Sequence, residues 1–373
     1  MTEQKDKVLV WDLPTRVFHW LLVMSVSSCW LTSDDDRYLY IHVFAGYATF
    51  ALLMFRLGWG IFGTHHARFR TFAYEWPSVT AYLKGLLNGQ AARHLGHNPA
   101  GSWAIFVILM LIFLTTVFGI LLFGGEEGHG PVSAYVTWAM GDLARPVHEF
   151  LAWSLLAVVG LHLAGVVVES FWHKENLTSA MITGYKDGGE GVGDHHGHVT
   201  QRGVMGVLIL VSMLVFAGYF FRGYVTSTKD DPFLPFEDSK LATNDVWHSE
   251  CGDCHMVYHP TLLPKRSWKR LMEEQHKHFG EDLDLDEDTV AEVERFLVDN
   301  AADNRMTEPA RKILDSIPPH DAPIRVTETP YWKRKHHEIS TAEWKKVHGH
   351  GDCSACHADA KEGTFEDAEM HLP

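Results

Sequence analysis

The sequence predicts an all-α protein, in which a membrane helix bundle is joined to a small water-soluble helical domain. Five apolar runs precede residue 222, and no strand-like alternation of apolar and polar residues stands out elsewhere. Charge is divided unevenly: residues 229–373 hold 31 acidic and 18 basic side chains, whereas residues 1–228 hold 16 and 14. We therefore expect a membrane domain in residues 1–190, a fifth membrane helix and linker in residues 191–240, and an acidic soluble domain in residues 241–373.

The five apolar runs are expected to cross a membrane. Most approach or exceed the roughly 20 residues that span the hydrocarbon core. The first run is short and carries Ser25, Ser27 and Ser28, which makes it the weakest of the five. The runs are Val17–Leu31, Tyr38–Phe62, Trp103–Phe123, Val147–Trp172 and Val204–Phe221.

Loop charges predict the orientation of these helices. Basic residues gather at the N-terminus, in the loop after the second helix and in the loop after the fourth, whereas the opposite loops carry Asp34–Asp36 and Glu126–Glu127. Because basic loops stay on the inner side, the N-terminus is expected to be cytoplasmic. Five crossings then place the C-terminal domain outside. The expected location is the bacterial inner (cytoplasmic) membrane, multi-pass, with a periplasmic C-terminal domain.

Two copies of Cys-x-x-Cys-His follow the membrane part, at Cys251–His255 and Cys353–His357. The two thiols of such a motif add across the vinyl groups of haem, and the adjacent histidine is then placed to ligate the iron. A zinc site or a thioredoxin-type pair would also show Cys-x-x-Cys, but neither calls for the histidine. We therefore expect two covalent c haems, and their attachment outside the inner membrane agrees with the loop charges. The attaching thiols are Cys251, Cys254, Cys353 and Cys356, and the first iron ligands are His255 and His357.

The soluble domain also shows helical periodicity. It covers Ser267–Phe279, Leu285–Asn300 and Thr341–Val347. His276 and His278 would then lie two residues apart on one helix and point in different directions, so at most one of them can face a given iron.

Four histidines lie within the apolar runs, where ionisable residues are rare and usually functional. His148 and His162 are 14 residues apart in one helix, so both project from one face, about 21 Å apart along the axis. His42 starts the second helix near the outer side, and His19 starts the first helix near the inner side. Histidines at the same depth in the membrane can meet, so we expect His42 to pair with His148 and His162 to pair with His19. Each pair could clamp one b haem; the alternative is that these side chains only hydrogen-bond within the bundle.

The N-terminal half resembles the bacterial cytochrome b-561 family, which includes the b-type subunits of nickel–iron hydrogenases. The resemblance covers about residues 7–190 and implies a four-helix dihaem b core ligated by the four histidines above. The fifth helix would then tether the soluble domain. The matching segments are Trp11–Trp20, His42–Gly46, His148 with His162, His173–Leu177 and Ala180–Gly184.

The C-terminal domain resembles the bacterial dihaem cytochromes c. This resemblance implies bis-histidine iron, with His278 serving the first c haem and His336 the second. The competing ligands are His276, His337, His259, His320, His348, His350, Met256, Met272 and Met306. The matching segments are Cys251–His255, Pro260–Pro264 with Ser267-Trp268, His278–Asp282, Thr327–Pro330, Lys335-His336 and Cys353–His357.

Glu169 and His173 lie near the inner end of the fourth membrane helix. They could handle protons for a quinone, and a solvated helix end is the alternative. The lone Cys29 lies in an apolar run, which is typical of a small buried hydrophobic residue.

These features together predict a membrane-bound tetrahaem electron carrier with two b haems and two c haems. It would pass electrons between quinone or quinol in the lipid and a periplasmic redox protein such as a small cytochrome c. It would act either as a quinol–cytochrome c-type oxidoreductase or as a non-catalytic carrier. The acidic soluble domain favours basic redox partners and disfavours nucleic acid. A reductase or peroxidase with an open c haem, and an electron-transfer subunit of a larger dehydrogenase, are the rival hypotheses. The sequence allows a homodimer or a larger complex.

Overall fold

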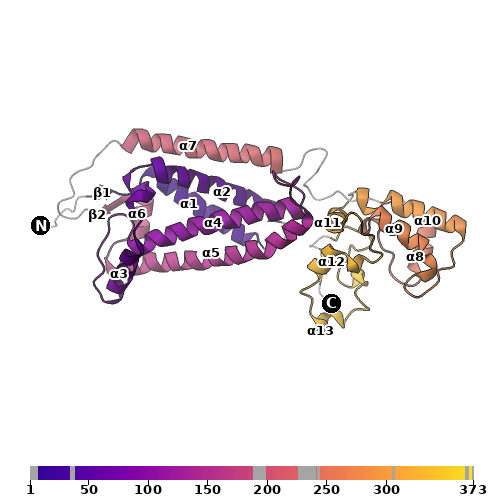
Figure 1. Ribbon diagram of the computed structural model, residues 1–373. Coiled ribbons are helices and arrows are strands. Elements are labelled where there is room, and N and C mark those ends of the chain that lie inside the picture. Colours follow the sequence, from indigo (N-terminus) through magenta and orange to yellow (C-terminus); the bar gives the residue numbers. More distant parts are fainter. Residues whose placement is uncertain are drawn as a thin grey trace. The chain divides into compact units, whose positions relative to one another are not determined.

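The computed structural model describes residues 7–33, 38–187, 199–225, 241, 244–304, 307–365 and 369–371. Most of the expected linker, residues 223–240, and the candidate ligand Met306 therefore lie outside the described residues. The chain divides into two compact units (Figure 1): a membrane unit, residues 1–136 and 140–226, and a C-terminal unit, residues 227–373 together with 137–139. Each unit is described on its own.

The membrane unit contains seven α-helices and two short strands among the described residues. The long helices α1, α2, α4 and α5 lie side by side, and α7 lies along α1 and α2 (Figure 1). The shorter helices α3 and α6 and the strands gather at one end of the bundle, which we call the strand end. The elements are β1 (Lys7–Leu9), α1 (Leu13–Leu31), α2 (Leu39–Phe62), α3 (Trp76–Leu87), α4 (Pro99–Glu126), α5 (Trp138–Trp172), α6 (Leu177–Thr183), β2 (Tyr185–Asp187) and α7 (Val199–Phe220), which a short π-helix, Phe221–Val225, continues.

Four helices of the described residues are long and apolar enough to cross a membrane: α2, α4, α5 and a segment of α7, Gly203–Gly223. The first expected crossing does form a helix, α1, but it is not one of these four. One of its polar residues, Ser25, is bonded inside the bundle. Ser25 donates a hydrogen bond to the carbonyl of Ala45 (2.7 Å) and lies 2.8 Å from the Thr49 hydroxyl, both on α2. The low apolarity of α1 therefore reflects contacts with its neighbour.

Asp12 fixes the start of α1 to the end of α2. Its carboxylate is buried and accepts hydrogen bonds from the backbone of Thr15 (2.9 Å), the indole of Trp59 (3.0 Å) and the hydroxyl of Thr64 (2.7 Å). The first of these bonds is an N-cap, which satisfies a free amide at the helix start. Because all three donors serve one buried charge, Asp12 sets the depth at which α1 enters the bundle.

The strand end is closed by the antiparallel pairing of β1 with β2, in which Val8 lies opposite Lys186. This pairing brings residues before α1 next to residues after α6. Gly184, with a positive φ of 92°, ends α6 and turns the chain into β2. A side chain at Gly184 would collide with the carbonyl of Trp11, so the turn requires glycine.

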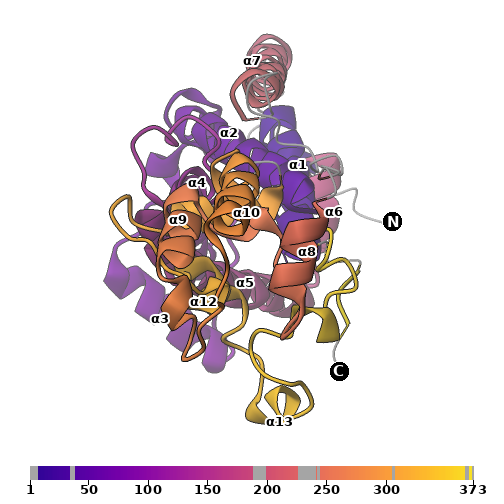
Figure 2. The same ribbon diagram turned by 90° about the vertical axis from the view of Figure 1, so that its right-hand side faces the viewer.

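The C-terminal unit is helical. Helix α8 (Asp245–Gly252) carries the first cysteine of the first motif, and α9 (Lys265–Glu273) packs against α10 (Glu287–Asp299), as Figure 2 shows. The remaining helices are α11 (Glu308–Ser316), α12 (Pro330–Lys335) and α13 (Thr341–Trp344).

Two hydrophobic clusters form the interior of this unit. The α8–α10 cluster contains Trp247, Leu263, Trp268, Met272, Val293, Leu297 and Ala301. The α11 cluster contains Leu262, Ile313 and Ile317.

The sequence predicted a helix over Ser267–Phe279, and this extent is wrong at its C-terminal end. Helix α9 ends at Glu273 and gives way to a 3-10 turn, Gln275–Lys277. Phe279 (φ 51°) and Gly280 (φ 108°) both lie in the left-handed region, which an α-helix cannot contain. His276 and His278 therefore do not share a helix.

Candidate functional site

His42 on α2 and His148 on α5 are the histidines expected near the outer side of the membrane, and we call them the outer pair; His19 and His162, expected near the inner side, are called the inner pair. The ring centroids of the outer pair lie 6.2 Å apart, with the planes at 69°. Each ring is held by a backbone carbonyl: Nδ1 of His42 donates to Cys29 (2.9 Å), and Nδ1 of His148 donates to Thr115 (2.9 Å). A carbonyl can only accept, so Nδ1 carries the proton and Nε2 keeps its lone pair. Orientation of this kind is typical of histidines that bind metals.

The spacing of this pair fits one metal ion between two imidazoles. Bonds of about 2 Å on both sides of the metal put the ring centroids about 6 Å apart. Gly119 on α4 makes room for the arrangement, because a Cβ there would lie 3.0 Å from Cε1 of His148. The two rings and the glycine thus form a site into which a bis-histidine haem fits.

The inner pair, His19 on α1 and His162 on α5, lie close enough to interact electrostatically. Nδ1 of His19 is buried and has no hydrogen-bond partner in the described part of the chain. The His19 ring meets the ring of Trp20 edge to face, at 5.2 Å. His19 and His162 thus lie on the two helices that depth predicted, and the His19 ring is less completely held than the rings of the outer pair.

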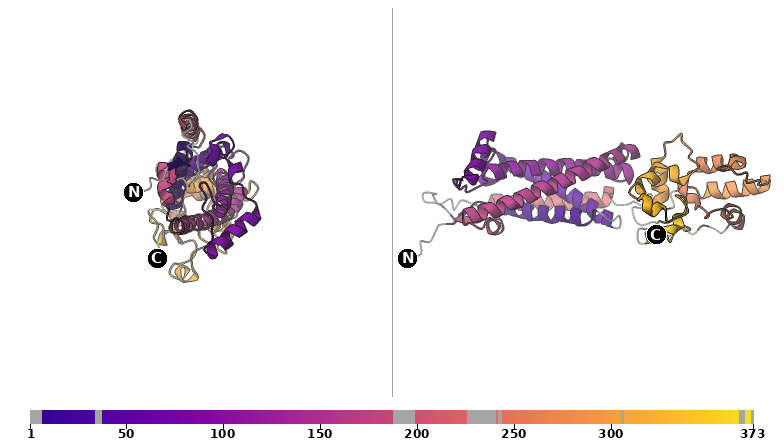
Figure 3. Two further views of the ribbon diagram at one scale, coloured as in Figure 1. Left: turned by 90° about the vertical axis from the view of Figure 1, so that its left-hand side faces the viewer. Right: turned by 90° about the horizontal axis from the view of Figure 1, so that it is seen from below.

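Helix α5 carries one histidine of each pair and approaches α1, α2 and α4 less closely than α2 approaches α1 and α4. Figure 3 (right) shows α5 running obliquely to α4. Its contacts are made through long side chains, such as Leu155 in a cluster with Leu53 and Ile112, and Trp153 against Trp30 at 4.9 Å. A flat cofactor between α5 and the other helices requires this separation.

The two Cys-x-x-Cys-His histidines are each matched by a second ring. His255 lies 6.2 Å from His278, and His357 lies 6.3 Å from His336. Nδ1 of His255 donates to the carbonyl of Met256 (2.7 Å), and Nδ1 of His336 donates to that of Trp332 (2.8 Å). Both spacings again fit one metal ion between two imidazoles.

The protonation state of these rings also favours metal binding. Burial lowers the pKa of His278, His336 and His357 below the ordinary value. A neutral ring keeps the lone pair that a metal ligand needs.

The neighbouring histidines are engaged elsewhere. Nδ1 of the exposed His276 lies 2.8 Å from the carboxylate of Asp282, and Nδ1 of the exposed His337 donates to the carbonyl of Arg334 (2.6 Å). His259 is buried against the Thr261 hydroxyl (2.6 Å), and burial lowers its pKa to about 4. Of the other competitors, Met272 is buried in the α8–α10 cluster, Met256 is half-buried, and His320 and His348 are exposed. His350 packs on Trp344 (4.2 Å) and on Trp332 (5.7 Å), and it lies near enough to His336 to interact with it electrostatically.

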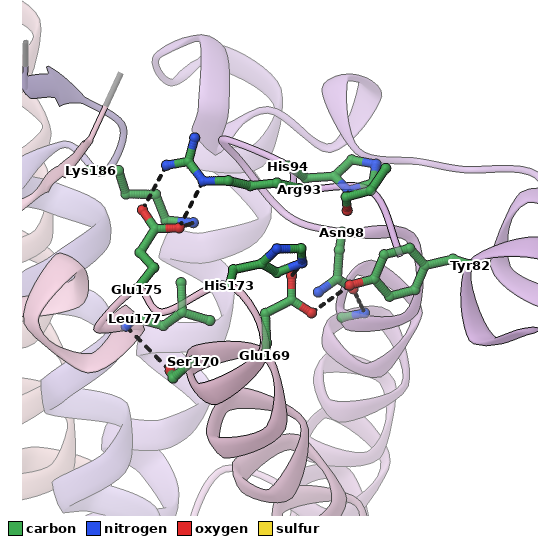
Figure 4. A network of polar contacts seen from close by, with 12 residues as sticks. Tyr82, Arg93, His94, Asn98, Glu169, Ser170, His173, Glu175, Leu177 and Lys186 are labelled. Atoms are coloured by element: carbon green, nitrogen blue, oxygen red, sulfur yellow. Dashed lines mark hydrogen bonds and ion pairs between the residues drawn. The ribbon is translucent and has the colours of Figure 1, made fainter. Parts of the chain in front are cut away.

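A polar network lies at the strand end (Figure 4). Glu169 of α5 is buried, accepts a hydrogen bond from the hydroxyl of Tyr82 on α3, and lies 3.7 Å from Nε2 of His173. Burial and the neighbouring Glu169 raise the pKa of Tyr82. A carboxylate, an imidazole and a phenol in one network can exchange protons with a bound molecule. The sequence indicated Glu169 and His173; Tyr82 was missed, because nothing local indicates that it reaches a residue 87 positions away.

A second polar group adjoins this network (Figure 4). Glu175 pairs with Arg93 (3.0 Å) and with the buried Lys186 of β2 (3.9 Å). Burial lowers the pKa of Lys186. These contacts tie the loop after α3 and strand β2 to the segment that follows α5.

An apolar cavity of about 690 Å3 lies elsewhere in the membrane unit, between α2, α4 and α7. Its lining includes the hydroxyls of Tyr47 and Ser212 and otherwise apolar side chains such as Met54, Leu208 and Phe216. Neither a carboxylate nor an imidazole is among its described lining residues. The cavity therefore suits an apolar chain better than proton-coupled chemistry.

Comparison with known proteins divides the chain at the same place as the two units. Residues 10–184 match the family model described as prokaryotic cytochrome b561, and residues 247–365 match the one described as dihaem cytochrome c. The probable Ni/Fe-hydrogenase B-type cytochrome subunit of Cupriavidus necator is 24% identical over 213 residues, which are 48% of this chain and 86% of the relative. The corresponding subunit of Azotobacter vinelandii is 26% identical over 218 residues, 49% of this chain and 90% of the relative.

Solved structures match the C-terminal unit. A dihaem cytochrome c from Rhodobacter sphaeroides is 40% identical, with 34% of this chain and 98% of that chain covered and a TM-score of 0.31. A dihaem cytochrome c from Shewanella baltica is 30% identical, with 35% and 93% covered and a TM-score of 0.29.

Proposed function

We propose that this member of the prokaryotic cytochrome b561 and dihaem cytochrome c families carries electrons between the quinone pool and a periplasmic redox protein. The first family covers residues 10–184 and the second covers residues 247–365. The family matches make it a multi-pass membrane electron-transfer protein with b-type and c-type haem domains. The proposal adds the haem count, the ligands and the two partners.

The haem count rests on the spacing of the histidine pairs. We assign one b haem to His42 and His148, one to His19 and His162, and the c haems to His255 with His278 and to His357 with His336. The observation that supports this most strongly is the recurrence of a 6.2–6.3 Å ring separation in three of the pairs. Haem supplies reversible one-electron chemistry at such sites. Backbone carbonyls fix the tautomer and direction of four of these rings, those of His42, His148, His255 and His336.

The direction across the membrane follows from the loop charges and from the thioether chemistry, which both favour a periplasmic C-terminal unit. Quinone would then react at the inner, strand end, beside His19 and His162. The Tyr82–Glu169–His173 network supports this position, because quinone chemistry moves protons together with electrons. On the water side, the excess of acids after residue 229 favours a basic partner such as a small cytochrome c. The activity would be that of a quinol–cytochrome c-type oxidoreductase.

In this assignment every iron has two protein ligands, which argues against a reductase or peroxidase with an open iron. The second candidate is an electron-transfer subunit of a larger complex. It is favoured by relatives named as hydrogenase B-type cytochrome subunits. A dehydrogenase that docked on the outer face would compete there with the fused c domain, so we place this candidate second.

The test is a haem count on the purified protein. Acid–acetone extraction should remove two b haems per chain and leave two covalent c haems. The variant His162→Ala should lose the inner b haem alone and keep both c haems, because thioether attachment does not depend on the membrane helices. The control His173→Ala should retain all four haems. Removal of only one haem by extraction of the intact protein would refute the assignment of two membrane sites.

A further inference from the structure

Tyr258 lies between the two c-type sites of the C-terminal unit. It follows the first motif by three residues, and its ring centroid is 5.1 Å from that of His255, with the planes at 50°. Its hydroxyl donates a hydrogen bond of 2.8 Å to the carbonyl of Gly351. Gly351 precedes Cys353, the first thiol of the second motif, by two residues. One side chain therefore contacts both motifs.

Packing holds the Tyr258 side chain in this position. The ring packs against the α8–α10 cluster on one side and against the α11 cluster on the other. A Cβ at position 351 would collide with the Tyr258 hydroxyl oxygen. Glycine at 351 is thus what lets the hydroxyl reach the backbone of the second motif. A ring confined by two clusters and one hydrogen bond has little freedom to leave the space between the sites.

We propose that Tyr258 is the bridge through which electrons pass between the two c haems. This inference rests on the proposed function, since it needs haems at both motifs. The path runs from the His255 imidazole to the Tyr258 ring, through the hydroxyl and its hydrogen bond to the Gly351 carbonyl, and along the backbone to the Cys353 thioether. Electron tunnelling decays less steeply through bonds and hydrogen bonds than through gaps, and this path contains one gap, between the two rings.

The transfer needs no other reactant. One electron leaves a ferrous haem and reduces the ferric haem of the other motif, so one iron is oxidised and one reduced. No bond is made or broken and no proton moves. Tyr258 stays a protonated phenol throughout, and it contributes orbitals and position.

The test compares Tyr258→Phe, which keeps the ring and removes the hydrogen bond, with Tyr258→Leu, which removes both. Tyr331→Phe is the matched control, because Tyr331 also packs against the α11 cluster but lies 22 or more positions from either motif in the sequence. Electrons are injected into the oxidised full-length protein by flash photolysis of a ruthenium photoreductant. The exchange between the two c haems is then followed by absorption, and their midpoint potentials are measured separately.

We expect exchange to slow severalfold in Tyr258→Phe and by about an order of magnitude or more in Tyr258→Leu, with potentials and low-spin spectra preserved. The control should exchange at the original rate. Unchanged exchange in both variants would show that electrons pass directly between the porphyrins and would overturn the proposal. Slowing that appears only together with altered ligation would overturn it too, because Tyr258 would then have a purely structural role. If Tyr258→Leu fails to bind haem, the exchange rate of Tyr258→Phe alone tests the proposal. A missing haem in the unaltered protein would instead refute the proposed function.

Discussion

For each c haem, two histidines close together in the sequence are candidates for the second iron ligand. In the structure, the side chains of the two candidates point in different directions. His278 and His336 face the motif histidines, whereas His276 and His337 are exposed and bonded to other groups. We expect His278→Ala and His336→Ala each to convert one low-spin c haem into a high-spin, carbon-monoxide-binding one. Attachment should survive, since the thioether bonds do not involve the sixth ligand. Absorption and electron paramagnetic resonance spectra measure the change.

The exposed neighbours supply the controls. His276→Ala and His337→Ala should leave both c haems low-spin, because neither ring meets a motif histidine. If His278→Ala and His336→Ala also keep fully low-spin spectra, the ligands must come from the other histidines or from a methionine.

Among the elements, the short helix α12 connects the second c site to the interior of its unit. Its N-cap, Thr329, is fully buried, accepts a hydrogen bond from the amide of Trp332 (3.3 Å) and donates one to the carbonyl of Val326 (2.7 Å). Trp332 in turn stacks on His336, with centroids 4.3 Å apart and planes at 14°. The start of this helix therefore sets the direction of a proposed iron ligand.

Thr329→Ala should lower the free energy of unfolding of the C-terminal unit by about 1–2 kcal/mol, the upper part of the range for a lost N-cap. The loss should lie in the upper part of that range because Thr329 is fully buried and the mutation also removes the hydrogen bond from its hydroxyl to the Val326 carbonyl. The backbone amide of residue 329 still donates to that carbonyl. The measurement is urea denaturation followed through the spectrum of the second c haem. Ser340→Ala, which removes the exposed cap of α13, is the control and should cost less. Equal losses in the two variants would contradict the role given to burial.

The helices also show which features local sequence patterns can predict. The depth of His42 and His148 follows from helix geometry, so their meeting could be inferred from the sequence alone. The end of α9 at Glu273 could not, because the helical periodicity of the sequence continues beyond it to Phe279. Nor could the bonds from Tyr82 to Glu169 and from Tyr258 to Gly351, which join residues 87 and 93 positions apart. Such contacts depend on how whole elements pack.

For the whole molecule, the proposed direction of electron flow has an energetic consequence. In the proposed orientation, electrons released by quinol at the inner side would be delivered outside. The outside is the positive side of an energised membrane, so the electrons would move toward the positive side. Moving one elementary charge across the full membrane potential changes its free energy by about 2.3 kcal/mol per 100 mV. An electron is drawn toward a positive potential, so the potential should speed this transfer.

We therefore expect quinol-driven reduction of the c haems in sealed vesicles to accelerate when an inside-negative potential is imposed, and to return to its original rate with an uncoupler. An inside-positive potential should slow it. Stopped-flow absorption of the c haems measures both effects. A rate indifferent to the potential, with a quinone analogue bound near His42 and His148, would place the quinone site at the outer haem instead.

The hydrogen bond between Tyr258 and Gly351 also bears on how the C-terminal unit matures. It joins positions 93 residues apart, and closing a loop of this length costs conformational entropy. In the proposed orientation, the first motif would reach the periplasm before Gly351, so its haem would be attached to a chain that is still open. The second attachment would then occur next to the residues that close the loop. We therefore expect the N-terminal motif to be loaded first and the loop to close last.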